Sequence, residues 1–64
     1  MQTNMNQAIG EKRRAELAIK DGRWEKAQEL IESLEARVLT AGSTDEADII
    51  GDFVDDLWEA LESA

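Results

Sequence analysis

The sequence has no cysteine, histidine, proline or tyrosine, and only two tryptophans and one phenylalanine among 64 residues. Without cysteine the chain forms neither disulfides nor thiolate metal sites, and without histidine it lacks the commonest metal ligand. A chain this short buries only about 60% of its unfolded surface, so its core is marginal without disulfides, a metal or oligomerisation. Oligomerisation is the support that remains, and we therefore expect a homodimer without cofactor or metal.

Long apolar runs are also missing. No stretch of about 18 consecutive apolar residues is present, so we expect no membrane-spanning helix. The opening letters MQTNMNQAIGEKRR lack the positive start and apolar run of a secretory signal. The absence of cysteine fits a reducing compartment. These features predict a soluble, cytoplasmic protein with one helical domain over residues 1–64.

Basic residues are absent from the last third of the chain. All seven bases lie in residues 1–40, where seven acids balance them, so the net charge of −8 falls entirely on residues 41–64. The stretch STDEADIIGDFVDDLWEALESA, residues 43–64, holds eight carboxylates. This charge asymmetry is the most informative global feature of the sequence.

What the sequence does contain is helical periodicity, which is clearest in residues 44–62. Ser43 and Glu46 form a capping box, and Gly42 is expected to take the left-handed conformation that ends the preceding helix. Apolar residues then recur at helical spacing: Ala47, Ile50, Val54, Leu57, Leu61 and Ala64, flanked by Phe53 and Trp58.

Two further helices are indicated before that one. Residues 23–41 carry a second apolar face, whereas residues 4–20 carry a thinner stripe whose phase differs by about 90°. The change of phase falls at Asp21-Gly22, a pair that commonly breaks helices. We therefore expect three helices over about 4–20, 23–41 and 44–62. The alternative is a two-helix hairpin whose long first helix bends near Gly22.

Two short stretches resemble known helical families. The letters GRWEKA, residues 22–27, with Ala15 before them, resemble the middle of a tetratricopeptide repeat, which implies an antiparallel helical hairpin. The letters DEADI, residues 45–49, resemble the start of the second helix in Rop-type plasmid RNA-binding proteins. That resemblance implies a helical hairpin that dimerises into a bundle. Both imply architecture only, since function depends on sites. The expected fold class is all-α, a small helical hairpin or three-helix protein in a dimeric bundle.

Catalytic chemistry is not expected. The letters D-E-A-D at residues 45–48 lack the preceding strand and the phosphate-binding loop of a nucleotide hydrolase. The six hydroxyl side chains have no histidine, cysteine or tyrosine beside them to act as a base. Carboxylates along a helix also lack the wrapped loop of a calcium site. We expect no enzyme and no catalytic, cofactor-binding or metal site.

The carboxylates of the last helix line one face, and the candidate partner-binding set is Asp48, Asp52, Asp55, Asp56 and Glu59. One interpretation is that they are the solvated side of an amphipathic helix. Against this, like charges at i, i+4 each cost about 0.2–0.5 kcal/mol. The other interpretation is that they bind a basic partner. That partner is another protein's nucleic-acid-binding groove or this chain's own basic patch of Lys12, Arg13 and Arg14.

The strongest signal is apolar. The residues expected to build the core or a dimer interface are Trp24, Ile31, Leu34, Val38, Ile50, Phe53, Val54, Leu57, Trp58 and Leu61. The function they favour is a small non-enzymatic protein–protein interaction or regulatory protein acting as a homodimer, of the kind that phages, plasmids and bacteria encode. Two alternatives are an acidic inhibitor that mimics nucleic acid and a Rop-like RNA-binding regulator using the basic patch. A net charge of −8 opposes binding to nucleic acid.

Overall fold

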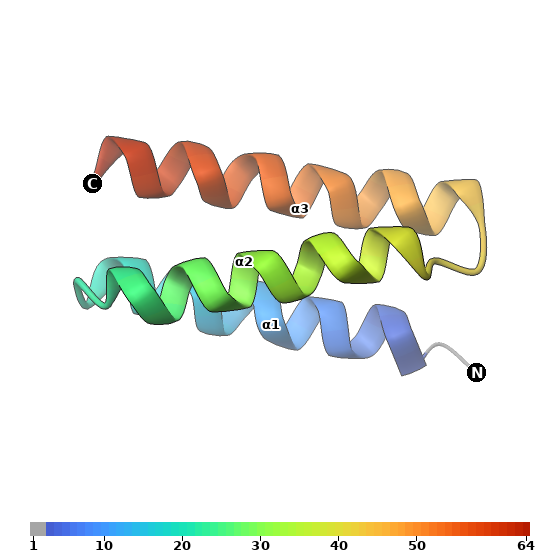
Figure 1. Ribbon diagram of the computed structural model, residues 1–64, viewed down its shortest axis with the longest axis horizontal. Coiled ribbons are helices and arrows are strands. Elements are labelled where there is room, and N and C mark those ends of the chain that lie inside the picture. The colour runs from blue at the N-terminus through green and yellow to red at the C-terminus, as the bar shows by residue number, and fades with distance from the viewer. Residues whose placement is uncertain (1–2) are drawn as a thin grey trace.

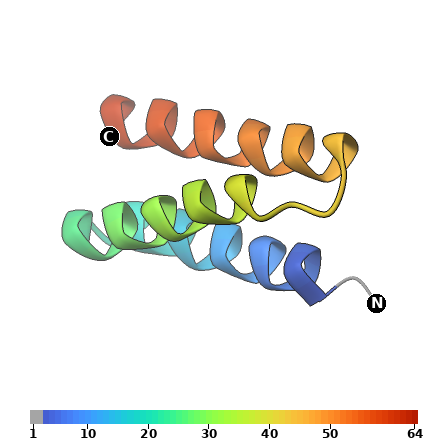
Figure 2. The same cartoon turned by 45° about the vertical axis from the view of Figure 1, so that its right-hand side comes forward.

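The computed structural model describes residues 3–64, which form three α-helices: α1 (Thr3–Lys20), α2 (Trp24–Leu39) and α3 (Thr44–Ser63). Helix α2 runs antiparallel to α1 and α3, which are parallel to each other (Figure 1). The N-terminal end of α1 and the loop between α2 and α3 lie at one end of the bundle, as both views show (Figures 1 and 2). The expected all-α bundle is confirmed, and the two-helix alternative is wrong.

The break between α1 and α2 is a tight turn at Gly22, whose φ of 76° lies in the left-handed region. The backbone N–H of Arg23 donates to the carbonyl of Ala18 at 2.8 Å, and that of Gly22 donates to Ile19 at 3.1 Å. This pair of bonds is the Schellman pattern, which satisfies the last carbonyls of a helix and favours glycine. The helix-breaking role expected of Asp21-Gly22 is therefore explained.

The capping at the start of α3 agrees with the sequence in part. The Ser43 side chain accepts a hydrogen bond from the backbone N–H of Glu46 at 3.1 Å, as a capping box requires. The Glu46 carboxylate, however, accepts from the backbone N–H of Gly42 at 2.8 Å. Gly42 has no positive φ, and among the described residues Gly22 is the glycine that has one. The left-handed conformation expected at Gly42 is therefore wrong.

The core lies between the three helices and is apolar throughout. Helix α1 supplies mostly small side chains, whereas α2 and α3 supply the large ones. The buried residues are Ala8, Ala15, Ala18 and Ile19 from α1; Ala27, Leu30, Ile31 and Leu34 from α2; and Ile50, Val54 and Leu57 from α3. The thin apolar stripe expected on α1 therefore does pack into the core, mainly through alanines. Alanines remove little apolar area from water, which leaves other large side chains of this small chain uncovered.

Candidate functional site

The acidic face of α3 points away from the core. Ile50, Val54 and Leu57 are buried on one side of the helix, and at 100° per residue the carboxylates fall on the opposite side. The five predicted partner-binding carboxylates, Asp48, Asp52, Asp55, Asp56 and Glu59, are all exposed. The two ion pairs among residues 3–64 involve other side chains, so none of these five is neutralised by a base of the same chain.

The predicted basic patch does not form one surface. Lys12 forms an ion pair with Glu16 at 2.8 Å, and its ammonium lies 5.4 Å from the centre of the Phe53 ring. Arg13 and Arg14 are exposed. Because successive helical residues point about 100° apart, the three bases face in different directions. The structure therefore separates the three bases from each other, and none of them forms an ion pair with a carboxylate of α3.

The predicted core or interface residues fall into three groups by burial. Five are buried within one chain: Ile31, Leu34, Ile50, Val54 and Leu57. Four are half-buried at the margin of the core: Val38, Phe53, Trp58 and Leu61. Trp24, the first residue of α2, remains 46% exposed. The second and third groups are available to a partner, whereas the first is occupied by the fold itself.

Two isoleucines are exposed along the seam where α1 and α3 lie side by side. Ile9 is 38% exposed and Ile49 is 45% exposed. Ile9 lies three residues before Lys12 on α1, and Ile49 lies four residues before Phe53 on α3. At these spacings each isoleucine is on the same helix face as the residue that follows it. The Lys12–Phe53 contact joins the two helices, so both isoleucines border the same seam. This surface, which we call the α1/α3 seam, was not distinguished by the sequence.

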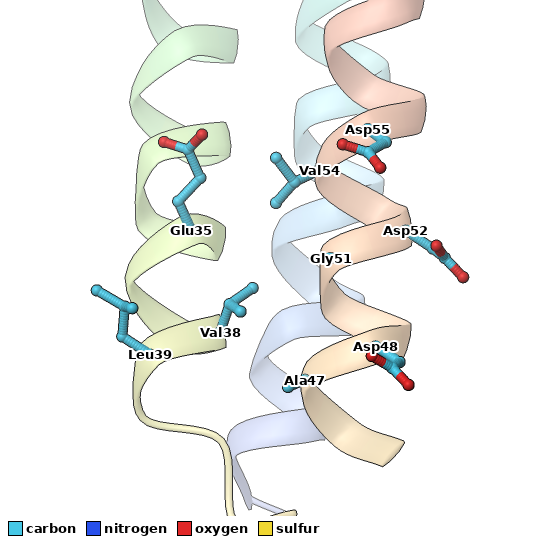
Figure 3. Close-up of a pocket in the computed structure, with 9 residues that line it drawn as sticks. All are labelled: Glu35, Val38, Leu39, Ala47, Asp48, Gly51, Asp52, Val54 and Asp55. Carbon is cyan, nitrogen blue, oxygen red and sulfur yellow. The ribbon is translucent and has the colours of Figure 1, made fainter. Parts of the chain in front are cut away.

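An open groove of about 510 Å³ lies between α2 and α3 on the side of the bundle opposite α1 (Figure 3). Figure 3 shows Val38 and Val54 pointing toward one another across its floor, while Asp48 and Asp52 point away from α2. Its lining residues are Glu35, Val38 and Leu39 from α2 and Ala47, Asp48, Gly51, Asp52, Val54 and Asp55 from α3. The groove therefore combines an apolar floor with carboxylates on its rims.

The feature that sequence reasoning missed is a polar network across the three helices. Arg37 on α2 donates to Glu11 on α1 through Nε at 2.7 Å and Nη2 at 3.3 Å, and through Nη1 to Asn4 at 3.0 Å. Ser33 donates to the same Glu11 carboxylate at 2.7 Å. Asn4 then donates to Glu46 on α3 at 3.2 Å. The network links α1, α2 and α3 near the N-terminal half of α1.

The Glu11–Arg37 pair at the centre of this network is largely shielded, with side chains 12% and 22% exposed. Burial raises the pKa of Glu11, but the hydrogen bonds from Arg37 and Ser33 and the charges of Arg37 and Arg14 outweigh it, so that pKa is lowered. The hydrogen bond to Glu11 outweighs burial for Arg37 and raises the pKa of its guanidinium. Both groups are therefore held in their charged forms.

A signal for this pair exists in the sequence. Glu11 lies three residues after Ala8 and four before Ala15, which puts a carboxylate inside the buried stripe of α1. A charge at such a position requires a partner, because an unpaired buried charge is costly. The partner could not be named, because which base faces Glu11 depends on how α1 packs against α2.

Among residues 3–64, no group of three or more Asp or Glu side chains is placed to hold a metal ion. In the same range, no helix is long and apolar enough to cross a membrane. The chain matches no protein-family model, no curated protein and no solved structure. The resemblances to tetratricopeptide repeats and Rop-type proteins therefore stay predictions.

Proposed function

We propose that this chain is a small non-enzymatic interaction protein that acts as a homodimer and binds a basic protein partner through α3. The observation that carries the proposal is the separation of charge between helices. Helix α1 has four bases against two acids, whereas α3 has eight acids and no base. A helix with this much unneutralised charge repels itself at i, i+4 spacing, and a cationic partner would relieve that repulsion.

The dimer is supported by the apolar α1/α3 seam. Ile9 and Ile49 are exposed there beside the half-buried Phe53, and apolar and aromatic side chains of this kind are typical interface anchors. In a two-fold dimer across this seam, α1 of one copy would lie against α3 of the other, so opposite net charges would meet. Association would also bury apolar surface that so small a core leaves in water.

The dimer is tested by light scattering across micromolar concentrations. We expect a mass of two chains for the wild type and of one chain for Ile49→Lys, because the lysine would put a charge where the wild-type dimer buries an apolar side chain. Ala36→Lys adds the same charge on an exposed position of α2 and should leave the dimer intact. A wild-type mass of one chain at every concentration would rule the dimer out, and a dimeric Ile49→Lys would rule out this seam.

The basic partner is tested by neutralising α3 without changing its shape. A cross-linking pull-down first identifies the cationic proteins that the wild type captures. Capture of these proteins should be abolished in a triple variant with Asp52→Asn, Asp55→Asn and Asp56→Asn. The matched control, with Glu25→Gln, Glu29→Gln and Glu32→Gln, removes three exposed charges from α2 and should retain capture. Equal capture by both triple variants would mean that the acidic face is a solvated surface and would end the proposal.

A further inference from the structure

We propose that the groove between α2 and α3 is a docking site for a cationic amphipathic helix of a partner protein. The inference rests on the proposed binding of a basic partner and specifies where and in what conformation that partner binds. It differs from binding to the acidic face alone, because it requires apolar contacts as well as charge.

The groove is apolar where a helix would insert its side chains. Val38 is half-buried and Val54 is buried, and they face each other across the floor (Figure 3). Leu39 at the end of α2 is 88% exposed on the rim, which makes it the most exposed of the large apolar residues described. A Cβ atom added at Gly51 would meet nothing within 4 Å, so the centre of the α3 side is open. These features leave room for an apolar side chain from outside.

The rims of the groove supply the charge. Glu35 stands on the α2 side, and Asp48, Asp52 and Asp55 stand on the α3 side. No lysine or arginine is among the lining residues. Asp48 and Asp52 point outward from α3 (Figure 3), so basic side chains flanking an inserted apolar ridge would reach them without entering the floor. The chemistry that complements this surface is an apolar stripe bordered by lysine or arginine.

The length of the groove fits a helix of about two turns. Its α3 lining runs from Ala47 to Asp55, which at 1.5 Å per residue is about 12 Å. Apolar side chains at positions i, i+4 and i+7 of a helix span about the same distance, and such triplets are the usual anchors of a helix bound in a groove. The occupant is therefore expected to place three apolar residues along the floor.

A second copy of this chain is a poorer occupant. Its cationic helix is α1, whose outer face carries Arg13, Lys20 and the 60% exposed Leu17. That face points away from the groove, because α1 lies behind α2 and α3 (Figure 3). Copies joined through α1 and the groove would repeat head to tail and would not close as a pair. The groove is separate from the α1/α3 seam, so it stays open in the proposed homodimer.

The test uses a fluorescently labelled synthetic peptide of about 14 residues, with leucines at i, i+4 and i+7 and lysines beside them. Fluorescence anisotropy should show salt-sensitive binding to the wild-type protein. Gly51→Leu fills the open centre of the groove and should weaken binding at least about tenfold. Gly10→Leu makes the same exchange on α1, where an added Cβ would have only the Arg14 side chain at 3.8 Å, and should bind like the wild type.

The peptide itself has two controls. A peptide of equal composition with its leucines spread around the helix should bind at least about tenfold more weakly, because it has no apolar ridge to insert. A peptide with the same ridge and glutamates in place of lysines should not bind. Far-UV circular dichroism of both glycine variants verifies the fold, and a leucine in place of a helical glycine should stabilise each of them.

A second readout reports the site directly. Trp58 donates from Nε1 to the Glu35 carboxylate at 3.3 Å, and Glu35 lines the groove. In a Trp24→Phe background, Trp58 is the remaining tryptophan. Binding of a lysine-bearing helix at the groove should then shift the Trp58 emission, whereas binding confined to the outer acidic face should not.

The outcomes separate this inference from the proposed function. If Gly51→Leu binds the peptide as tightly as the wild type, or if both peptide isomers bind equally, the groove is not the site. The acidic face then still serves as the partner-binding surface, provided that the α3 triple variant loses capture. If the wild-type protein does not bind the peptide but still captures basic partners, the groove is not the docking site and the proposed function still stands. If the wild-type protein neither binds the peptide nor captures basic partners, both proposals are wrong.

Discussion

Replacing Leu57 with aspartate should unfold the protein. Leu57 is 1% exposed and belongs to the apolar core, to which all three helices contribute. Removing such a side chain costs about 2–5 kcal/mol, and the buried carboxylate adds a further penalty. A single core in a chain of this size supplies only about 3–5 kcal/mol, so little folded protein should remain. Far-UV circular dichroism and thermal melting measure the result.

The matched control for this substitution is Ser63→Asp. Ser63 lies on the same helix and is exposed, so the variant adds the same charge to the same acidic helix without entering the core. Its melting temperature should fall only slightly, since surface substitutions usually change stability by less than about 0.5 kcal/mol. A Leu57→Asp protein that melts like the control would contradict the packing described for α3.

Glu11→Gln should be the second most damaging change. It keeps the size of the side chain but removes the charge that accepts from Arg37 and Ser33. Hydrogen bonds to charged groups contribute about 1.5–3 kcal/mol, and the guanidinium left behind is only 22% exposed. We expect a loss of about 2 kcal/mol, which lowers the melting temperature by about 8–16 °C for a chain of this size.

The chain provides a matched control in its other ion pair. Glu16→Gln is the same substitution in the Lys12–Glu16 pair, where the carboxylate side chain is 52% exposed. An exposed pair contributes about 0–1 kcal/mol, so this variant should melt close to the wild type. Arg37→Lys is a third variant for this comparison. It should also lower the melting temperature, because an ammonium cannot reproduce the bidentate contact of the guanidinium with Glu11. Equal losses from Glu11→Gln and Glu16→Gln would show that shielding of the pair contributes nothing.

The same pair predicts how stability varies with pH. The folded state lowers the pKa of Glu11 below its ordinary value of 4.5, so its contribution is complete above that value. The contribution is lost as the pH falls below 4.5 and through the lowered pKa of the folded state. Denaturant melts of the wild type and of Glu11→Gln should therefore differ by a constant amount near neutrality and converge in acid. If the difference in stability between the two proteins stayed constant down to the lowest pH, Glu11 would not be the group whose lowered pKa stabilises the fold.

Local signals were sufficient for the helices. The expected ranges of about 4–20, 23–41 and 44–62 compare with Thr3–Lys20, Trp24–Leu39 and Thr44–Ser63. Periodicity, the Ser43 cap and the Asp21-Gly22 break are properties of neighbouring residues, so they can be read without knowing the fold. The left-handed conformation expected at Gly42 was wrong, and the contacts of its loop are in part non-local. The carboxylate of Glu46 holds that loop and is itself bound by Asn4, which lies 42 residues away along the chain.

The proposed interaction surfaces were less predictable than the helices. Sequence pattern put Trp24, Phe53 and Trp58 near the apolar faces of their helices, but their exposure depends on which neighbour covers them. Whether Ile49 is covered was undetermined for the same reason, because it lies between the apolar and acidic faces of α3. The groove between α2 and α3 exists only when two helices meet, so no single-helix pattern could indicate it.

The sequence by itself determined that the chain is helical, where each helix lies and that the charge is concentrated on the last one. These properties follow from local propensity, periodicity and composition. The tertiary structure decided which carboxylate is paired and which stay free, which apolar residues remain at the α1/α3 seam, and where a groove forms. The physical reason is that pairing, burial and concavity belong to contacts between helices, and these depend on how α1, α2 and α3 pack together.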